Sequence, residues 1–584
     1  MTSTNTNPGL ESPPATAAAQ ATPVVDAPAA DPRRWAAFII MTVATFMDML
    51  DGSIVNVALP AIQANLGASF VQLQWITAGY VFAFALTLIT GGRLGDIYGR
   101  RRMFQLGVLG FVVTSFLCGI ASNPEMLVAS RLAQGLAAGL MVPQVMSIIH
   151  VTFPDKEKGV VFAIQGTIGG IAATIAPLVG GLIMAANIFD WSWRPIFLIN
   201  VPIGIIGYLL GWKYINESKA QERIKLDLVG VVLATLSLTA LLFPLTFGRE
   251  LHWPAWGFVL MAASVVGFLG FVAYERAKQR KDGMPLVPLA LFKNRSFSAA
   301  LALMLGMFTF TGMFMLALYL FLQEGLGFSP LRTGVTLLAF CIGAFITASA
   351  SVVALVPKFG RAVLQVGAVV IAVGIAVFLL MLSPDITSWG LVPGLLLIGL
   401  GFGMTATPIA LFALQEVPHQ DAGAASGLIN TKQQLGFAVG IAIVTLAFFS
   451  PLAANGLSNA ESVAPQVRQE LVAAGVAEAK ADELANAFKS CSSNSLAGTP
   501  DVAAGACATL QQDPQAKAIA DKYAHEVANK SFTSAFNTTL YVGFGFAALA
   551  LLLASFLPRW LKQEEWGAPA EEGAEEGAED TAKA

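Results

Sequence analysis

The chain contains fourteen apolar segments of helical length, and these segments limit its fold more than any other feature. Each is long enough to cross, as a helix, a bilayer core roughly 30 Å thick. Only 12% of the residues are charged, about half the share found in soluble domains. The sequence therefore predicts an all-α integral membrane protein. The segments are residues 35–59, 75–95, 103–121, 126–150, 160–184, 195–215, 227–247, 255–275, 297–322, 332–356, 362–382, 389–412, 424–450 and 534–558.

The distribution of lysine and arginine predicts the orientation of these segments. If the N-terminus is cytoplasmic, the inner connections and the two tails hold most of the 34 basic residues. The short outer connections then hold only Arg194, Arg249 and Arg332. Because short cytoplasmic loops are enriched in Lys and Arg, both ends of the chain are expected in the cytoplasm.

Three regions lie outside the apolar segments. Residues 1–34 are rich in Ala, Thr and Pro and predict a disordered tail, not a cleaved signal. Residues 559–584 are acidic and predict a second solvated tail. Residues 451–533 are moderately polar, and the helical spacing of Val467–Phe488 and Gln515–Val527 predicts a helical hairpin outside the membrane.

Two of the four cysteines fall in this outer segment. Cys491 and Cys507 would face an oxidising compartment, so they are candidates for a disulfide, and free thiols are an equal alternative. Cys118 and Cys341 lie within apolar segments and are interpreted as packing residues.

The first apolar segment carries two acidic residues. Asp48 and Asp51 are three residues apart and therefore share one face of a helix. A carboxylate in the hydrocarbon core is expensive unless it faces a polar cavity or carries a proton, and such a group suits a proton carrier. The alternative is that they lie near the outer interface and only solvate the helix end.

A glycine- and arginine-rich connection follows the second segment. This connection contains Gly92, Asp96, Gly99, Arg100 and Arg101 at the spacing G-x-L-x-D-x-x-G-R-R, which is more specific than positive charge alone. The structural alternative is that the motif is only a tight turn in a basic inner loop. The ordered spacing resembles the inner-loop signature of the major facilitator superfamily.

Two further segments carry candidate functional residues. Arg131 lies inside the fourth segment and, since it stays charged, needs a partner such as a carboxylate, or a path to the interface. Pro177, Gly180 and Gly181 in the fifth segment resemble the superfamily's antiporter signature, although Ala172 and Ala176 stand where that pattern has glycine. The structural alternative for Pro177 is a simple helix kink.

The whole set of motifs resembles the drug:proton antiporter-2 family of that superfamily, the EmrB/QacA type with fourteen spans. In this comparison Asp51 matches the acid of the first helix, whereas Asp48 lies outside the pattern. Arg131 matches the arginine of the fourth helix. The segments that carry the resemblance are Leu50–Pro60, Trp193–Gly204, Asp227–Gly230, Leu291–Phe297, Gly327–Pro330 and Gly427–Gly436.

The resemblance implies the major facilitator fold, with two six-helix bundles and two inserted helices. The expected division is a bundle at 35–215, a linker with the two extra helices at 216–296, and a bundle at 297–558 that includes the outer loop. It also implies proton-driven export of amphipathic drugs or antibiotics by alternating access, in a bacterial plasma membrane. A dedicated exporter of one metabolite and an uptake carrier of the same fold are the alternatives.

The remaining expectations concern chemistry and partners. No metal-ligand spacing joins the four histidines and no Gly-Lys pair forms a P-loop, so we expect no enzyme and no cofactor beyond the proton gradient. The expected partners are small amphipathic molecules, protons and the lipid bilayer, not nucleic acid, and the chain is expected to be a monomer. Glu324 is a candidate second titrating site, and an interfacial glutamate is the alternative.

Overall fold

The computed structural model describes Thr2 and residues 32–187, 190–219, 226–248, 251, 253–281, 285–415, 417–418, 421–497, 500–512 and 514–560. The two predicted tails therefore lie almost entirely outside the described residues.

The described residues form helices and contain no β-strand. The first group comprises α1 (Arg34–Leu66), α2 (Phe70–Tyr98), α3 (Arg100–Gly119), α4 (Pro124–Thr152), α5 (Asp155–Ala186), α6 (Pro195–Leu198) and α7 (Asn200–Tyr214). Next come α8 (Leu228–Phe247), α9 (Ala255–Lys281) and the short η2 (Leu289–Lys293). The remainder are α10 (Arg295–Leu320), η3 (Phe321–Gly325), α11 (Pro330–Ala350), η4 (Ser351–Leu355), α12 (Val356–Phe359), α13 (Ala362–Met381), α14 (Ser388–Leu414), α15 (Ala422–Val444), η6 (Thr445–Phe449), α16 (Ser450–Ala473), α17 (Glu478–Ala497), α18 (Pro500–Gln511) and α19 (Pro514–Ala554).

Thirteen helices within the described residues are long and apolar enough to cross a membrane. The one predicted segment beyond these thirteen, 160–184, lies within α5. The all-helical membrane architecture is thus confirmed, but several helix ends are not where the sequence placed them. The segment 195–215 breaks at Ile199 into α6 and α7, and α19 begins twenty residues before the predicted 534–558. A helix does not have to stop where its apolar residues stop, because polar residues continue the same backbone hydrogen bonds.

Side chains in the loops explain where several helices begin. The Asn123 carboxamide accepts from the Met126 N–H and starts α4. Asn294 does the same for α10 through the Phe297 N–H, and Ser329 starts α11. Each cap satisfies a backbone donor that the first helical turn leaves free.

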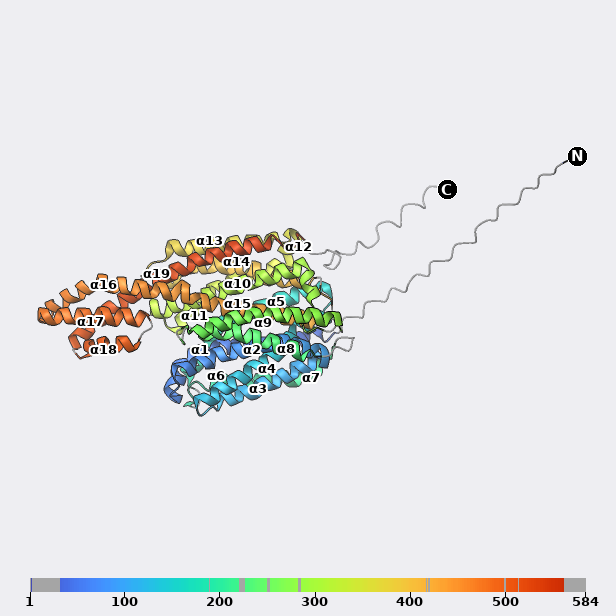
Figure 1. Ribbon diagram of the computed structural model, residues 1–584, viewed down its shortest axis with the longest axis horizontal. Coiled ribbons are helices and arrows are strands. Elements are labelled where there is room, and N and C mark those ends of the chain that lie inside the picture. The colour runs from blue at the N-terminus through green and yellow to red at the C-terminus, as the bar shows by residue number, and fades with distance from the viewer. Residues whose placement is uncertain are drawn as a thin grey trace, which may run out of the picture.

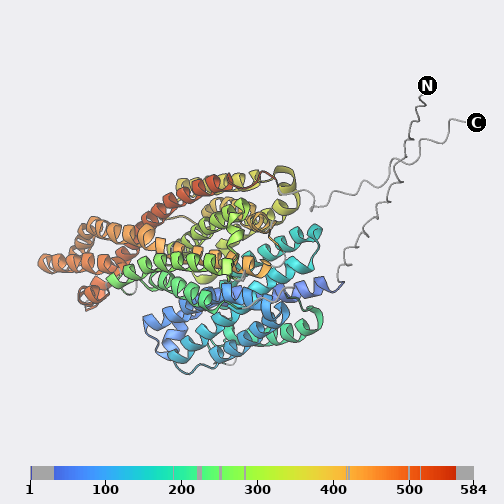
Figure 2. The ribbon, with the colours of Figure 1, turned by 45° about the vertical axis from the view of Figure 1, so that its right-hand side comes forward.

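The helices pack in two groups that follow chain order (Figure 1). In the first, α4 packs against α2 and α3, and α1 packs against α5 and α7. In the second, α14 packs against α11 and α13, and α10 packs against α15 and α19. The groups meet where α5 contacts α11 and where α2 contacts α15. Helix α8 packs against both α2 and α15, and α9 packs on α8. Figure 2 shows the same arrangement turned by 45°.

Small residues permit the tightest of these helix contacts. A methyl group on Gly91 would lie 2.3 Å from the Gly139 carbonyl oxygen, and one on Gly135 would lie 2.3 Å from the Tyr80 carbonyl oxygen. Helices α2 and α4 therefore touch backbone to backbone, as membrane helices do where glycine recurs at four-residue spacing. This close approach positions the polar residues of α4 against α1 and α2.

Helices α16 to α18 and the start of α19 project from one end of the molecule (Figure 1). They share an apolar core that includes Val463, Leu471, Phe488 and Val527. The prediction of one helical stretch over Val467–Phe488 is wrong: the chain turns at Gly475, where φ is +91°, and passes from α16 into α17. Glycine adopts this backbone conformation without the steric cost that a side chain would add.

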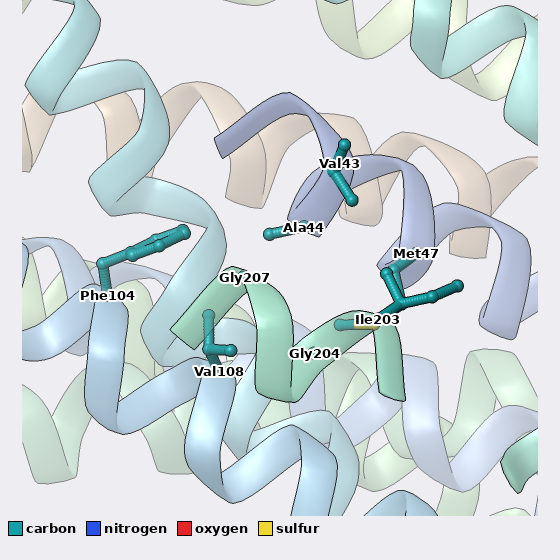
Figure 3. A pocket seen from close by; sticks show the side chains of 8 residues that line it. All are labelled: Val43, Ala44, Met47, Phe104, Val108, Ile203, Gly204 and Gly207. Atoms are coloured by element: carbon teal, nitrogen blue, oxygen red, sulfur yellow. The ribbon is translucent and has the colours of Figure 1, made fainter. Parts of the chain in front are cut away.

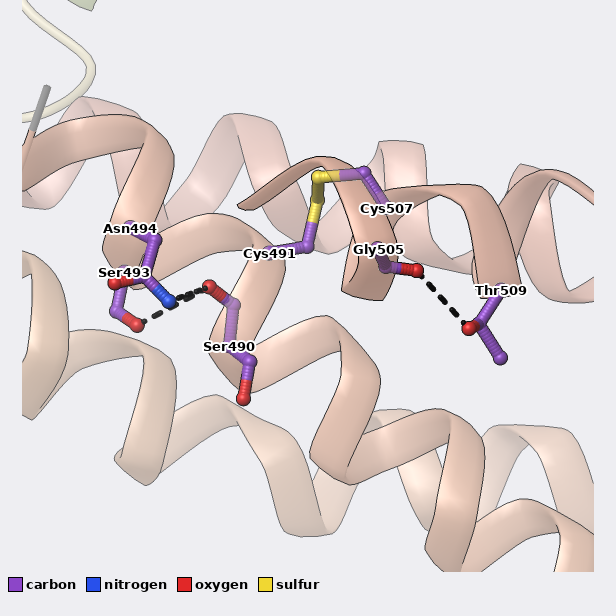
Figure 4. The surroundings of a disulfide bond; sticks show 7 residues. All are labelled: Ser490, Cys491, Ser493, Asn494, Gly505, Cys507 and Thr509. Atoms are coloured by element: carbon purple, nitrogen blue, oxygen red, sulfur yellow. Dashed lines mark hydrogen bonds between the residues drawn. A yellow bond between two sulfur atoms is a disulfide. The ribbon is translucent and has the colours of Figure 1, made fainter. Parts of the chain in front are cut away.

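We call α16 to α18 and the start of α19 the projecting unit, and a disulfide joins α17 to α18 within it. Cys491 and Cys507 are bonded, with their Cα atoms 5.0 Å apart (Figure 4). Cys118 and Cys341 are buried and take part in no disulfide among the described residues, as expected for packing residues.

Candidate functional site

An ion pair between Asp51 of α1 and Arg131 of α4 forms the centre of the site. The Arg131 Nη1 donates to Asp51 Oδ2, and both residues are fully buried. Arg131 also donates from Nε to the Ile76 carbonyl oxygen at 2.9 Å. Two opposite charges removed from water need each other, because either one alone would be a costly uncompensated charge.

Neutral donors complete the surroundings of the Asp51 carboxylate. Its Oδ1 accepts from Asn200 Nδ2 at 2.8 Å and from Gln134 Nε2 at 3.1 Å. Asn200, at the start of α7, also donates to the Ser115 hydroxyl of α3 at 3.1 Å. Gln134 in turn accepts from Arg131 Nη1 at 2.7 Å. Four helices thus hold one carboxylate in place.

Tyr80 of α2 connects Asp48 to the same cluster. Its hydroxyl donates to Asp48 Oδ1, and its ring lies under the Arg131 guanidinium, 4.1 Å from the centroid. Asp48 is itself buried. We call Asp48, Asp51, Tyr80, Arg131, Gln134 and Asn200 the acid cluster.

This arrangement makes the ion pair sensitive to a proton. A proton on Asp51 would remove the charge that binds Arg131 and would leave the guanidinium with its cation–π contact to Tyr80. The Arg131 Nη2 is buried and has no hydrogen-bond acceptor among the described residues, so the arginine is not saturated by its present partners. The expected alternative, acids that only solvate a helix end, does not agree with this burial.

At the other end of α2, the inner-loop signature forms a second charged group. Arg100 donates to Asp96 Oδ1 from Nη2 at 2.7 Å, and Arg93 Nη1 lies 3.9 Å from Asp96 Oδ2. All three side chains are buried. The signature's buried charges are therefore paired within their own helix–loop–helix unit.

The structure divides the arginines of this signature between two acids. Arg101 and Arg102 lie 3.9 and 3.7 Å from Glu217, which follows α7, and the Glu217 Oε1 also accepts from the Arg101 N–H. Among the described residues Arg101 therefore pairs with Glu217 and not with Asp96, because it points out of the turn toward α7 and stacks on Trp212. Gly99 makes that turn, with φ at +110°. Gly92 is buried in α2.

An ion pair also joins the starts of α1 and α5. Arg34 donates to Glu157 from Nε and Nη2, both at 2.8 Å. These hydrogen bonds hold the pKa of Glu157 below its ordinary value.

The antiporter signature lies in α5 where this helix passes α1. A methyl group on Gly180 would lie 2.8 Å from Ile54 Cγ1, whereas one on Gly181 would meet nothing within 4 Å. Pro177 is part of the same helix, which continues to Ala186. Only Gly180 of the two glycines is therefore required by helix contact.

The structure does not bring Glu324 to the acid cluster. It lies exposed in η3, after α10, and within the described part of the chain it makes no hydrogen bond or ion pair with those residues. The structure also offers no metal centre in the described ranges, since no three His, Cys, Asp or Glu side chains gather there.

An apolar hollow lies between α1, α3 and α7 (Figure 3). It has an empty volume of about 210 Å³, part of it open to the outside. None of its lining residues carries a polar side chain, and none belongs to the acid cluster: Val43, Ala44, Met47, Phe104, Val108, Ile203, Gly204 and Gly207.

Sequence reasoning missed several residues of these sites. Tyr80 and Ser115 gave no signal, because a single hydroxyl in an apolar segment is common. Asn200 was visible inside the segment Trp193–Gly204, but nothing indicated which side chain it would bind. Glu217 was an ordinary loop glutamate in the sequence.

Comparisons with known proteins agree with this architecture. The family model described as Major Facilitator Superfamily matches residues 41–441. A protein named probable actinorhodin transporter, from Streptomyces coelicolor, is 41% identical over 542 residues, which covers 91% of this chain and 93% of that protein. The tetracenomycin C resistance and export protein of Streptomyces glaucescens is 34% identical, covering 70% of this chain and 75% of that protein.

A solved structure supports the fold independently. The human organic anion transporter MFSD10 superposes with a TM-score of 0.53 at 13% identity, covering 90% of this chain and 99% of that one. Together with the family match, this similarity confirms the resemblance drawn from the motifs, and the chain belongs to the major facilitator superfamily.

Proposed function

We propose that this protein is a proton-coupled exporter that moves amphipathic drugs or antibiotics across a bacterial plasma membrane by alternating access. Protons moving inward supply the energy, about 2.3 kcal/mol per charge per 100 mV plus the pH term. No other cofactor takes part, the working unit is the monomer, and both chain ends face the cytoplasm.

The observation that carries this proposal is the buried ion pair between Asp51 and Arg131. The Asp51 carboxylate also accepts hydrogen bonds from Gln134 and Asn200, so a change in its charge would alter its contacts with α4 and α7. A buried acid whose partners lie on several helices can convert proton binding into a change of helix packing.

The proposed cycle follows from the partners of Asp51. Without a proton, Asp51 binds Arg131 and holds α1 against α4. Protonation releases Arg131 and favours the state that opens outward and releases substrate. Loss of the proton to the cytoplasm restores the ion pair. Each state must bind the proton with a different affinity, since a ligand shifts an equilibrium only by differential binding.

Asp48 and Tyr80 have an accompanying role in this proposal. Their hydrogen bond lies next to the Arg131 guanidinium, so Asp48 is a second acid that can accept a proton or attract a cationic substrate. Asp96, Arg100 and Arg101 act at the inner gate, where they join α2, α3 and the segment after α7.

The substrate class comes from the relatives. Both proteins described above carry the name of an antibiotic, actinorhodin or tetracenomycin C. Because the first of them matches over nearly the whole of both chains, a dedicated exporter of a single metabolite or antibiotic is the second candidate.

Reconstitution in proteoliposomes tests both candidates. With an imposed pH gradient, a cationic dye and a neutral antibiotic should each move against their gradients if the pump is broad. Movement of one compound only would favour the dedicated exporter. Substrate movement that is unchanged when the gradient is collapsed would contradict proton coupling.

A further inference from the structure

Two buried acids lie outside the acid cluster, in the helix pair α8–α9. Asp227 precedes α8 and Glu275 lies in the last part of α9; they are 3% and 0% exposed. Neither was used in the mechanism above, and α8 and α9 are additions to the two helix groups. Burial of two carboxyl groups side by side requires an explanation, because each charged form is expensive away from water.

Each acid uses one oxygen to hold the local backbone. Asp227 Oδ1 accepts from the Gly230 N–H at 3.0 Å and from the Tyr274 hydroxyl at 2.8 Å. Glu275 Oε2 accepts from the Val287 N–H at 3.1 Å, in the linker that leads to α10. These contacts leave Asp227 Oδ2 and Glu275 Oε1 as the carboxylate oxygens that are not bound to the local backbone or to Tyr274.

The two other oxygens converge on one place. Asp227 Oδ2 and Glu275 Oε1 are buried and receive no hydrogen bond from any donor among the described residues. A methyl group on Gly230 would lie 2.8 Å from the former and 2.5 Å from the latter, so both oxygens lie over this glycine. Two acceptors that face each other repel unless one of them carries a hydrogen.

The surrounding charges do not neutralise this pair. No Lys, Arg or His of the described segments forms an ion pair with either acid. Basic groups on neighbouring elements bind other partners: Arg93 of α2 donates to the Pro285 carbonyl oxygen at 2.8 Å and lies 3.9 Å from Asp96. Lys278 interacts with Tyr274, one turn along α9.

We infer that Asp227 and Glu275 share one proton and so form a proton-binding site distinct from the acid cluster. The proton joins Oδ2 of one acid to Oε1 of the other and leaves a single negative charge on the pair. It thereby holds together the start of α8, the end of α9 and the linker at Val287. Through Pro285, the same linker holds Arg93 of the inner-loop signature.

This site makes a prediction about stability that does not depend on transport. The folded protein binds a proton that the unfolded chain releases more easily, so the stabilisation is present at low pH and is lost as pH rises. Stability therefore falls with pH from the range in which an exposed carboxyl loses its proton up to the pH at which the folded pair loses it, and levels off above that pH. The Glu275→Gln variant replaces the proton by an amide N–H that donates at any pH.

The experiment compares thermal unfolding of the purified full chain in detergent from acidic to alkaline pH. Wild type should match Glu275→Gln at low pH and unfold at a progressively lower temperature as pH rises, whereas the variant should not show this extra decline. Asp227→Asn, in which the amide donates in the other direction, should behave like Glu275→Gln. The exposed Glu483→Gln serves as the matched control and should follow wild type.

Two results would overturn the inference. Wild type and both amide variants with the same pH profile would show that no proton is shared. The second result is stabilisation of the wild type by sodium or calcium chloride but not by choline chloride. If Glu275→Gln lacks this stabilisation, the site binds a metal cation.

Hydrogen exchange adds a second readout: Glu275→Ala should increase exchange at residues 285–294, and Glu275→Gln should not.

Discussion

The Arg131 guanidinium lies between two acids of one helix: it donates to Asp51 and stacks on the tyrosine ring whose hydroxyl donates to Asp48. Both acids therefore respond to the same cation. Breaking such a buried pair by removing one partner typically costs about 3–5 kcal/mol. In the proposed mechanism, a proton on α1 would therefore change how α1, α2 and α4 pack.

The hydroxyl of Tyr80 is expected to matter separately from its ring. Tyr80→Phe keeps the ring under Arg131 but removes the donor to Asp48, and a buried acceptor left without its donor costs about 1–3 kcal/mol. We expect gradient-driven export to fall about tenfold and its pH profile to change, with the protein still folded. Export rates measured across pH in proteoliposomes test this. A wild-type profile in Tyr80→Phe would limit Tyr80 to a packing role.

Asn200 should be required for holding Asp51 rather than for the fold. Asn200→Ala removes the donor at 2.8 Å from Asp51 Oδ1 and leaves Gln134 and Arg131 in place. We expect reduced coupled export and a stability loss of about 1 kcal/mol, measured by transport and thermal unfolding. The exposed Asp385→Asn is the control and should leave both values unchanged. If Asn200→Ala transports normally, the donors from α7 have no part in coupling.

The two glycines of the antiporter signature should differ. Gly180→Ala places a methyl group 2.8 Å from Ile54 Cγ1, so the Ile54 side chain or the contact between α5 and α1 must shift, whereas Gly181→Ala meets nothing within 4 Å. Overpacking of this kind typically costs about 1–3 kcal/mol. Thermal unfolding in detergent should therefore show a loss for Gly180→Ala and little change for Gly181→Ala. Equal losses would mean that the contact between α5 and α1 does not set the requirement for glycine.

The disulfide should stabilise the projecting unit without affecting the membrane helices. Cys491 and Cys507 are 16 residues apart, and closing a loop of this size contributes about 3 kcal/mol. Cys507→Ser should make α17 and α18 more sensitive to limited proteolysis while export continues. Mass analysis of unreduced peptides should find the two cysteines linked in wild type. Free thiols at both positions would refute the bond.

Much of the fold could be predicted because apolar run length alone locates membrane helices. The same approach failed at the projecting unit, where helices continue past their apolar residues and the break at Gly475 carries only a weak sequence signal. Helix α19 is one continuous helix although only its second half is apolar.

The site was predictable in part for an energetic reason. Asp51 and Arg131 stood out because charge within an apolar segment is costly and needs a partner. Their pairing joins residues 80 positions apart, and Asn200 reaches Asp51 from 149 positions away. Such contacts depend on how four helices pack against one another. The spacing of residues along a single helix carries no information about that packing. For the same reason, the division of the arginines between Asp96 and Glu217 was not foreseen.

The most direct test separates proton coupling from substrate movement in the Asp51→Asn variant. In proteoliposomes, one assay measures export driven by a pH gradient, and the other measures exchange of labelled for unlabelled substrate with no gradient. The account predicts that Asp51→Asn loses the first and keeps the second, because the helices still move but no proton is carried. Gradient-driven export at the wild-type rate in this variant would contradict the role of Asp51.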